Sequence, residues 1–142
     1  MEAGRIYRHG AFYADAITGQ LKPKYLVVLA TTSGGDIVTR LLTSRHPGLR
    51  PKSPPCHHGD PYPGFYLGTP GPPLERETWI DLRPLHDLDA GLFQRDVRRA
   101  LMSPVLLLDR ALLHAALECA AGAEDTTRHQ ERAIRDTLAS LR

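Results

Sequence analysis

Two apolar segments joined by a glycine turn constrain the fold of this chain more than any other feature. Residues 25–30 form an unbroken apolar run, and residues 37–43 follow it after a turn that contains Gly34 and Gly35. Apolar runs of this kind, rich in β-branched and aromatic residues, are typical of strands covered on both faces. We therefore expect residues 25–30 to form the central strand of a sheet, with residues 37–43 returning antiparallel beside it.

This hairpin brings basic and hydroxyl side chains to one end of the sheet. Lys22 and Lys24 lie at the start of the first segment, and Thr43, Ser44 and Arg45 lie at the end of the second. Ammonium, guanidinium and hydroxyl groups bind phosphate oxygens, so the arrangement predicts a phosphate site. Each residue also has a plain alternative role, because exposed lysines need no special function and Thr-Ser pairs commonly end strands.

Composition indicates one globular domain over residues 1–142, with 42% hydrophobic and 24% charged residues. Residues 1–60 hold eight basic and four acidic residues, a local charge of +4, whereas the remainder holds ten and twelve, a charge of −2. The basic half favours an anionic ligand. The sequence has neither an apolar run of about 18 residues nor the pattern of a signal peptide, so we expect a cytoplasmic protein without a membrane partner.

The order of the remaining segments predicts an α+β domain. Residues 4–108 are rich in predicted strands, including short strands at 4–9 and 64–67, and residues 46–73 form a long proline-rich connection. A short helix is expected around residues 91–95, followed by an edge strand over 97–108 that Pro104 interrupts. The C-terminal part, residues 109–142, is helical. These elements predict a small curled antiparallel sheet or a partly open barrel with C-terminal helices.

The strand expected at residues 78–82 carries an aspartate. Strand alternation places Ile80 and Leu82 on one face and Trp79 and Asp81 on the other, so Asp81 does not share the apolar face. Asp81 either acts in a site or pairs with Arg83. Trp79 either packs in the core or, if its ring is exposed, stacks on nucleic-acid bases.

Four segments, in this order, resemble the MazF/PemK (Kid) toxins of type II toxin–antitoxin modules. They are a glycine-led strand, a basic residue before a hydrophobic strand, a strand that ends in Thr-Ser, and a strand that carries an aspartate, at residues 4–7, 22–29, 41–44 and 79–82. Their order and spacing carry the resemblance. At two positions the chain differs from the family, because Trp79 replaces an arginine and no histidine falls securely at the family's N-terminal histidine position.

The resemblance implies an SH3-like (CcdB/MazF-like) barrel and a homodimer that cleaves single-stranded RNA without metal or cofactor and is neutralised by a cognate antitoxin protein. Such cleavage needs a base for the 2′-hydroxyl, cations for the phosphorane and an acid for the 5′-oxygen. The catalytic residues expected from the resemblance and the local chemistry are Lys24, Thr43, Arg45, His46 and Asp81. The RNA-binding residues expected beside them are Lys22, Ser44, Trp79 and Arg83.

The proline-rich segment holds a second group of reactive side chains, at Cys56, His57, His58 and Asp60. Cysteine and histidine are zinc ligands, so this loop could belong to a metal-binding enzyme. However, no second Cys-x-x-Cys or His-x-x-x-His pair completes four ligands, and we expect no bound metal. The two cysteines, Cys56 in a loop and Cys119 in a helix, do not suggest a disulfide framework.

Three functions remain open from the sequence. They are an endoribonuclease toxin, a non-catalytic binding module of the same fold, and a hydrolase or metal-binding enzyme built around the Cys56-His57-His58 loop. The helix expected at residues 127–141 has a narrow apolar stripe of Ile134, Leu138 and Leu141. We therefore expect that this helix covers a dimer partner or docks loosely on its own chain.

Overall fold

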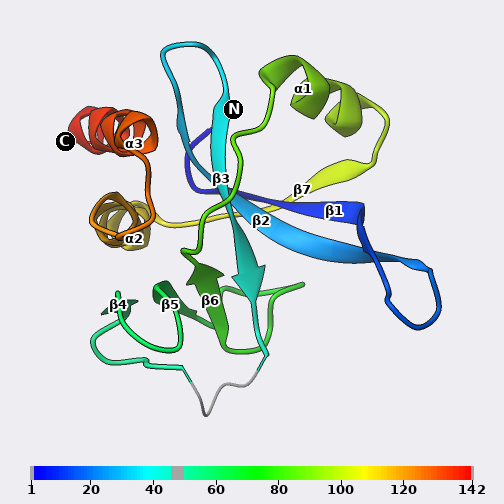
Figure 1. Ribbon diagram of the computed structural model, residues 1–142, viewed down its shortest axis with the longest axis horizontal. Helices are drawn as coiled ribbons and strands as arrows, with labels where there is room; N and C mark the ends of the chain where they lie inside the picture. The colour runs from blue at the N-terminus through cyan, green and yellow to red at the C-terminus, as the bar shows by residue number, and fades with distance from the viewer. Residues whose placement is uncertain (1, 46–49, 142) are drawn as a thin grey trace.

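The computed structural model describes residues 2–45 and 50–141, and these form an α+β fold with a seven-stranded antiparallel sheet and three helices (Figure 1). The strands are β1 (Arg5–Ala14), β2 (Leu21–Thr31), β3 (Ile37–Thr43), β4 (Cys56–His57), β5 (Gly64–Gly68), β6 (Thr78–Asp81) and β7 (Met102–Leu107). The helices are α1 (Ala90–Arg98), α2 (Arg110–Ala121) and α3 (Arg128–Ser140). Within the part of the chain that the structure describes, no helix is both long and apolar enough to cross a membrane.

The sheet has the strand order β4-β5-β6-β3-β2-β1-β7. β2 pairs antiparallel with β1 and β3, which confirms the predicted hairpin, although β3 rather than β2 lies at the middle of the order. β7 is an edge strand that contains Pro104, as predicted. The expected start of that strand at residue 97 is wrong, because Asp89 caps a helix that continues to Arg98.

One face of the sheet is covered by α2 and α3, which lie side by side (Figure 1). Val27, Leu42 and Ile80 on this face pack in one core with Leu117 of α2 and Ile134 of α3. Alternate residues of the same strands point to the other face, because strand side chains alternate. The main core therefore lies between the sheet and the two C-terminal helices.

The opposite face is covered in part by α1. Tyr7 and Leu26 form a smaller core there with Phe93 and Met102, and the Tyr7 and Phe93 rings meet edge to face with centroids 4.9 Å apart. α1 lies over the end of the sheet near β7, at the upper right in Figure 1. The ends of β3 and β6 on this face lie beyond α1, and the candidate site described below forms there.

The helix α3 belongs to the core of its own chain. Ile134 is fully buried and Leu138 is 6% exposed. Gln130 is also buried and joins two elements, because its Oε1 accepts from Arg40 Nη2 (3.0 Å) and its Nε2 donates to Asp87 Oδ1 (2.8 Å). The prediction of loose docking is therefore wrong, since the buried face of α3 is wider than its stripe of large aliphatic residues.

The proline-rich segment returns to the sheet and meets α2. β4 pairs with β5 at the sheet edge, and Cys56 of β4 forms a disulfide with Cys119 of α2, with Cα atoms 5.5 Å apart. The sequence did not suggest this disulfide. The two cysteines are separated by 63 positions in the sequence, and only the packing of the sheet edge against α2 brings them together.

Candidate functional site

A row of side chains crosses the open end of the sheet on the face that α1 leaves uncovered. Leu26 of β2 lies opposite Leu41 of β3, and Leu41 lies opposite Asp81 of β6, so these three side chains share a face. Lys24 precedes Leu26 by two residues and therefore points to the same side. Strand pairing thus brings Lys24 and Asp81, 57 positions apart in the sequence, to one end of this face.

Asp81 holds Arg83 in a fixed position. Arg83 Nη2 donates to Asp81 Oδ2 at 2.6 Å, Nε lies 3.0 and 3.1 Å from the two carboxylate oxygens, and the backbone N–H donates to Oδ1 at 3.0 Å. The Asp81 side chain is 10% exposed and that of Arg83 57%. The hydrogen bonds to Asp81 raise the pKa of Arg83. Because Arg83 engages both carboxylate oxygens, Asp81 acts chiefly by positioning this guanidinium.

Two guanidinium groups lie over the ring of Tyr62. Arg83 lies over its ring with 4.0 Å from the guanidinium carbon to the ring centroid, and Arg50 does so at 4.4 Å. Arg50 Nε also donates to the carbonyl oxygen of Arg45 at 3.0 Å. These cation–π contacts help to hold both guanidinium groups beside Tyr62. We call Lys24, Arg45, Arg50 and Arg83 the basic cluster.

Lys24 is the member of the basic cluster whose side chain is an amine, and it is half-buried. Half-burial lowers the pKa of its ammonium group from the ordinary value, and the Arg45 cation lowers it further. Asp81 opposes this shift, while Arg83 and Arg50 add to it. A lysine surrounded in this way gives up its proton more readily than a free lysine, and such amines serve as acids or bases in active sites.

His9 lies directly opposite Lys24 on the neighbouring strand β1. Cross-strand partners share a face of the sheet, so the imidazole belongs to the surroundings of Lys24. Its Nδ1 accepts a hydrogen bond from the backbone N–H of Ala11 at 3.2 Å, which places the ring proton of a neutral imidazole on Nε2. The sequence analysis missed His9, because placing it opposite Lys24 requires the register of β1 on β2.

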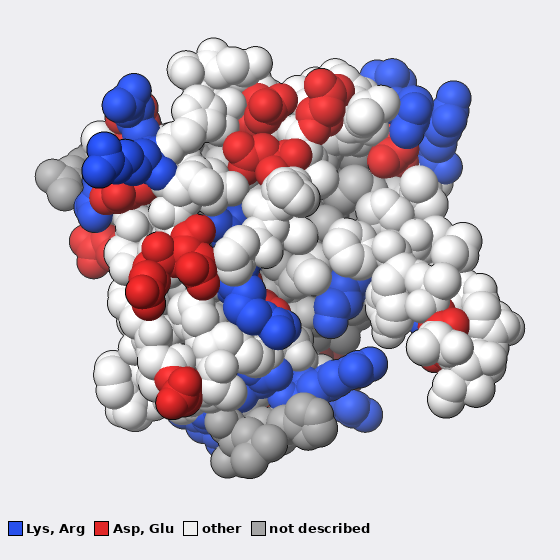
Figure 2. All heavy atoms as spheres, in the orientation of Figure 1, with Lys and Arg blue, Asp and Glu red and all other residues white. Residues whose placement is uncertain are grey.

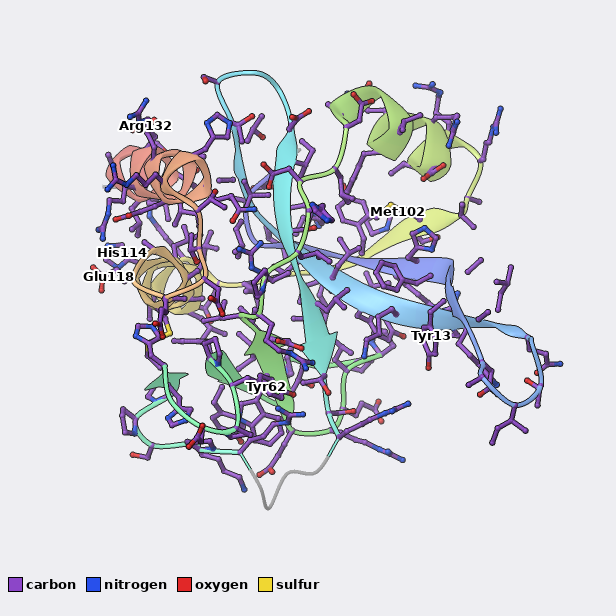
Figure 3. The ribbon with its side chains drawn as sticks, in the orientation of Figure 1. Tyr13, Tyr62, Met102, His114, Glu118 and Arg132 are labelled. Carbon is purple, nitrogen blue, oxygen red and sulfur yellow. A yellow bond between two sulfur atoms is a disulfide. The ribbon has the colours of Figure 1, made fainter. Side chains whose placement is uncertain are left out.

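The surface beside the basic cluster is hollowed. Figure 2 shows basic side chains in the lower centre of the molecule and also at its upper left and upper right, whereas acidic side chains lie mainly at the upper and left side of this view. Figure 3 shows Tyr62 at the same end, beside β6. A cavity of about 300 Å3 opens beside the cluster, lined by Leu41, Asp81, Arg83, Pro84 and Leu85. Charged side chains and a cavity therefore lie next to each other at this end of the sheet.

The predicted strand-end residues have different surroundings. Thr43 Oγ1 accepts from the Arg45 backbone N–H at 3.4 Å, so this hydroxyl shapes the turn that carries Arg45. Thr43 and Ser44 also line a neighbouring cavity of about 350 Å3 with Tyr25 and Leu74. Lys22 pairs with Tyr13 further out on the β1–β2 hairpin. His46, the expected base or acid, lies outside the described residues.

Trp79 is a packing residue. It is 3% exposed, its Nε1 donates to the carbonyl oxygen of Pro51 at 2.8 Å, and its ring lies 5.1 Å from that of Tyr66. A ring buried in this way has no face free for stacking on a base, so the packing alternative holds for this residue. The aromatic ring next to the basic cluster is Tyr62 instead.

The histidines of the proline-rich segment do not act as one chelating loop. The His57 ring faces the carbonyl oxygen of Asp60, whereas His58 Nε2 lies 3.4 Å from Cys56 Sγ and 3.6 Å from Cys119 Sγ. The group that could hold a metal among the described residues is therefore Cys56, His58 and Cys119, with one ligand from α2. The alternative built on Cys56, His57 and His58 therefore differs from the group in the structure, which only the fold brings together.

No protein-family model, curated protein or solved structure matches this chain. The function proposed next therefore depends on the residues and geometry of this chain.

Proposed function

We propose that this chain is a MazF/PemK-like toxin, a metal-independent endoribonuclease that cleaves single-stranded RNA at the basic cluster. The observation that carries the proposal is the gathering of three arginines, Arg45, Arg50 and Arg83, around one half-buried lysine with a lowered pKa. Phosphodiester cleavage needs both features, cations for the phosphate and a group that exchanges protons. The order of the sequence segments gives independent support.

In the proposed reaction, Lys24 in its neutral form removes the proton of the ribose 2′-hydroxyl. The 2′-oxygen then forms a bond to phosphorus, and the bond from phosphorus to the 5′-oxygen breaks. The ammonium group formed on Lys24 returns its proton to the leaving 5′-oxygen. The products are a 2′,3′-cyclic phosphate and a 5′-hydroxyl, so the step consumes no water and needs no metal.

The other residues stabilise and position the reacting phosphate. Arg45 and Arg50 neutralise the charge that grows on the phosphorane oxygens, and His9 donates from Nε2 to one of them. Asp81 holds Arg83 against Tyr62, and it also limits how far the pKa of Lys24 falls. Asp81 is thus a positioning residue, because its two oxygens are engaged by Arg83.

The direct test is cleavage of a fluorescent single-stranded RNA by purified protein in the presence of a metal chelator. We expect fragments that end in a 2′,3′-cyclic phosphate, and no cleavage of the same sequence as DNA, which lacks the 2′-hydroxyl. Lys24→Met should lower the rate by at least about 100-fold, the low end for loss of a general acid or base.

Arg8→Met is the matched control for the loss of positive charge. Arg8 lies opposite Tyr25 on the other face of β1, so its removal changes the net charge equally without touching the basic cluster. The proposal fails if the wild-type protein leaves every tested RNA intact. Binding of RNA without cleavage would favour the alternative, a non-catalytic module of the same fold.

We extend the proposal to the assembly and partners of the toxin. It acts in the cytoplasm as a homodimer of SH3-like barrels, and a cognate antitoxin with an acidic segment neutralises it by covering the basic cluster, because opposite charges would meet there. Sedimentation of the full chain at micromolar concentrations tests the dimer, and a monomer at all of them contradicts it. Rescue of bacterial growth by the protein encoded next to the toxin gene tests the antitoxin.

A further inference from the structure

Cys56, His58 and Cys119 form a compact group away from the basic cluster. Cys56 belongs to β4, His58 follows that strand directly, and Cys119 lies near the end of α2. The sulfur atoms lie between β4 and α2 (Figure 3). Cys119 is buried, Cys56 is half-buried and His58 is exposed, so one side of the group faces the core and the other faces solvent.

Two of the three distances between ligand atoms in this group match those of a tetrahedral zinc site, namely those from the His58 nitrogen to each sulfur. Zinc binds thiolate sulfur at about 2.3 Å and imidazole nitrogen at about 2.0–2.1 Å, so a sulfur and a nitrogen on one tetrahedral ion lie about 3.6 Å apart. His58 Nε2 lies 3.4 Å from Cys56 Sγ and 3.6 Å from Cys119 Sγ. The histidine nitrogen is therefore already at the separation that shared coordination would require from both sulfur atoms.

The neighbouring groups leave one coordination position open. The His57 ring is directed to the carbonyl oxygen of Asp60 and does not join the three ligands. His58 Nε2 also lies 2.9 Å from the carbonyl oxygen of Cys119, to which a neutral ring donates its proton. When Nε2 binds a metal instead, the ring proton moves to Nδ1. Two thiolates, one imidazole and a water molecule would then complete four ligands.

We propose that Cys56, His58 and Cys119 form a redox-gated zinc site, which is a disulfide under oxidising conditions and binds one zinc ion under reducing conditions. An external dithiol supplies two electrons and two protons to break the S–S bond, which yields two thiols. Zinc binding then displaces both thiol protons and requires the sulfurs to separate to about 3.8 Å. In both states a cross-link holds the proline-rich segment to α2.

This cross-link bears on the proposed active site without being part of it. The proline-rich segment that it anchors also carries Arg50 and Tyr62. The cytoplasm keeps most cysteines reduced, and the disulfide would open there. Zinc would then maintain the anchor where the proposed toxin acts. The inference itself rests only on the three ligands, so it stands or falls separately from RNA cleavage.

The experiment titrates metal-free, reduced protein with Co2+, which reports tetrahedral thiolate coordination by its visible and near-ultraviolet absorption. We expect one Co2+ per chain, displacement by one equivalent of Zn2+, and no such absorption from the oxidised protein. His58→Ala should weaken binding by at least about tenfold, because loss of even an outer-shell partner of a ligand costs 10–100-fold. His57→Ala, in the same loop, should bind as the wild type does.

Several outcomes would overturn the proposal. Reduced wild-type protein that gives no thiolate–Co2+ absorption, or His57→Ala that weakens binding as much as His58→Ala, would do so. Circular dichroism is recorded on the same samples, because reduction could unfold the chain. If the reduced protein unfolds, refolding on addition of Zn2+ supports the site, and failure to refold or to bind the ion contradicts it.

Discussion

Replacing Lys24 and Arg45 by alanine should lower the salt dependence of RNA binding by a predictable amount. Arg83 is paired with Asp81, so we count Arg45, Arg50 and the protonated form of Lys24 as the phosphate ligands in RNA binding. Each neutralised phosphate of a single strand contributes about 0.7 to the slope of log K against log salt concentration. The wild-type slope should therefore be about −2.1, and that of the double variant about −0.7.

These slopes translate into affinities that a titration can measure. Between about 50 and 200 mM salt, the affinity of the wild-type protein should fall about 20-fold, and that of the double variant only about threefold. Fluorescence anisotropy with a short RNA whose 2′-hydroxyls are methylated provides the measurement, because the proposed reaction cannot cleave such an RNA. The series needs about five salt concentrations.

Arg128→Ala combined with Arg132→Ala is the control, because both side chains are exposed on α3, across the sheet from the basic cluster. Figure 3 shows Arg132 on the outer side of that helix. This variant loses the same charge and should keep the wild-type slope. Equal slopes for the wild type and the Lys24/Arg45 variant, or an equal reduction in the control, would refute our assignment of the phosphate site.

Three further predictions concern proton transfer, the buried network and the disulfide. Asp81→Asn removes the charge that raises the pKa of Lys24, so the rise in cleavage rate with pH should move to lower pH. Arg45→Ala removes a charge that lowers this pKa and should move the rise to higher pH; shifts in the same direction would exclude Lys24 as the base. Gln130→Ala removes the hydrogen-bond partner of the buried Arg40 Nη2 and the donor to Asp87 Oδ1, although Arg40 Nη1 still donates to the carbonyl oxygen of Thr39. This change should lower the free energy of unfolding by about 2–4 kcal/mol in a urea titration; a loss below about 0.5 kcal/mol, as expected at exposed α3 positions, would contradict this. Reduction of the disulfide in metal-free buffer should lower the free energy of unfolding by about 4 kcal/mol for a closed loop of this length, and zinc at about 100 times its Kd should restore about 2.7 kcal/mol. A free energy of unfolding that zinc does not change would oppose the proposed metal site.

Local patterns in the sequence determined much of the sheet and the helices. The apolar runs around the Gly34-Gly35 turn predicted the β2–β3 hairpin, and Pro104 predicted an edge strand, because both depend on neighbouring residues. Alternation in the strand 78–82 correctly set Asp81 apart from the apolar face. The same reasoning placed Lys24 and Arg45 at one end of the sheet. The sequence alone could not place His9, since that required the register of β1 on β2.

Only the tertiary structure decided which distant residues meet. Arg50 joins the basic cluster and Tyr62 lies against it because the proline-rich segment folds back along the sheet. Proline-rich segments carry no periodic pattern that predicts their path. Cys119 meets Cys56 and His58 for a related reason, since α2 packs against the sheet edge that contains β4. Helix and strand periods determine which face of its own element a side chain occupies. Which face then packs against which other element depends on packing across the whole chain. The lowered pKa of Lys24 and the three-ligand group both arise from that packing.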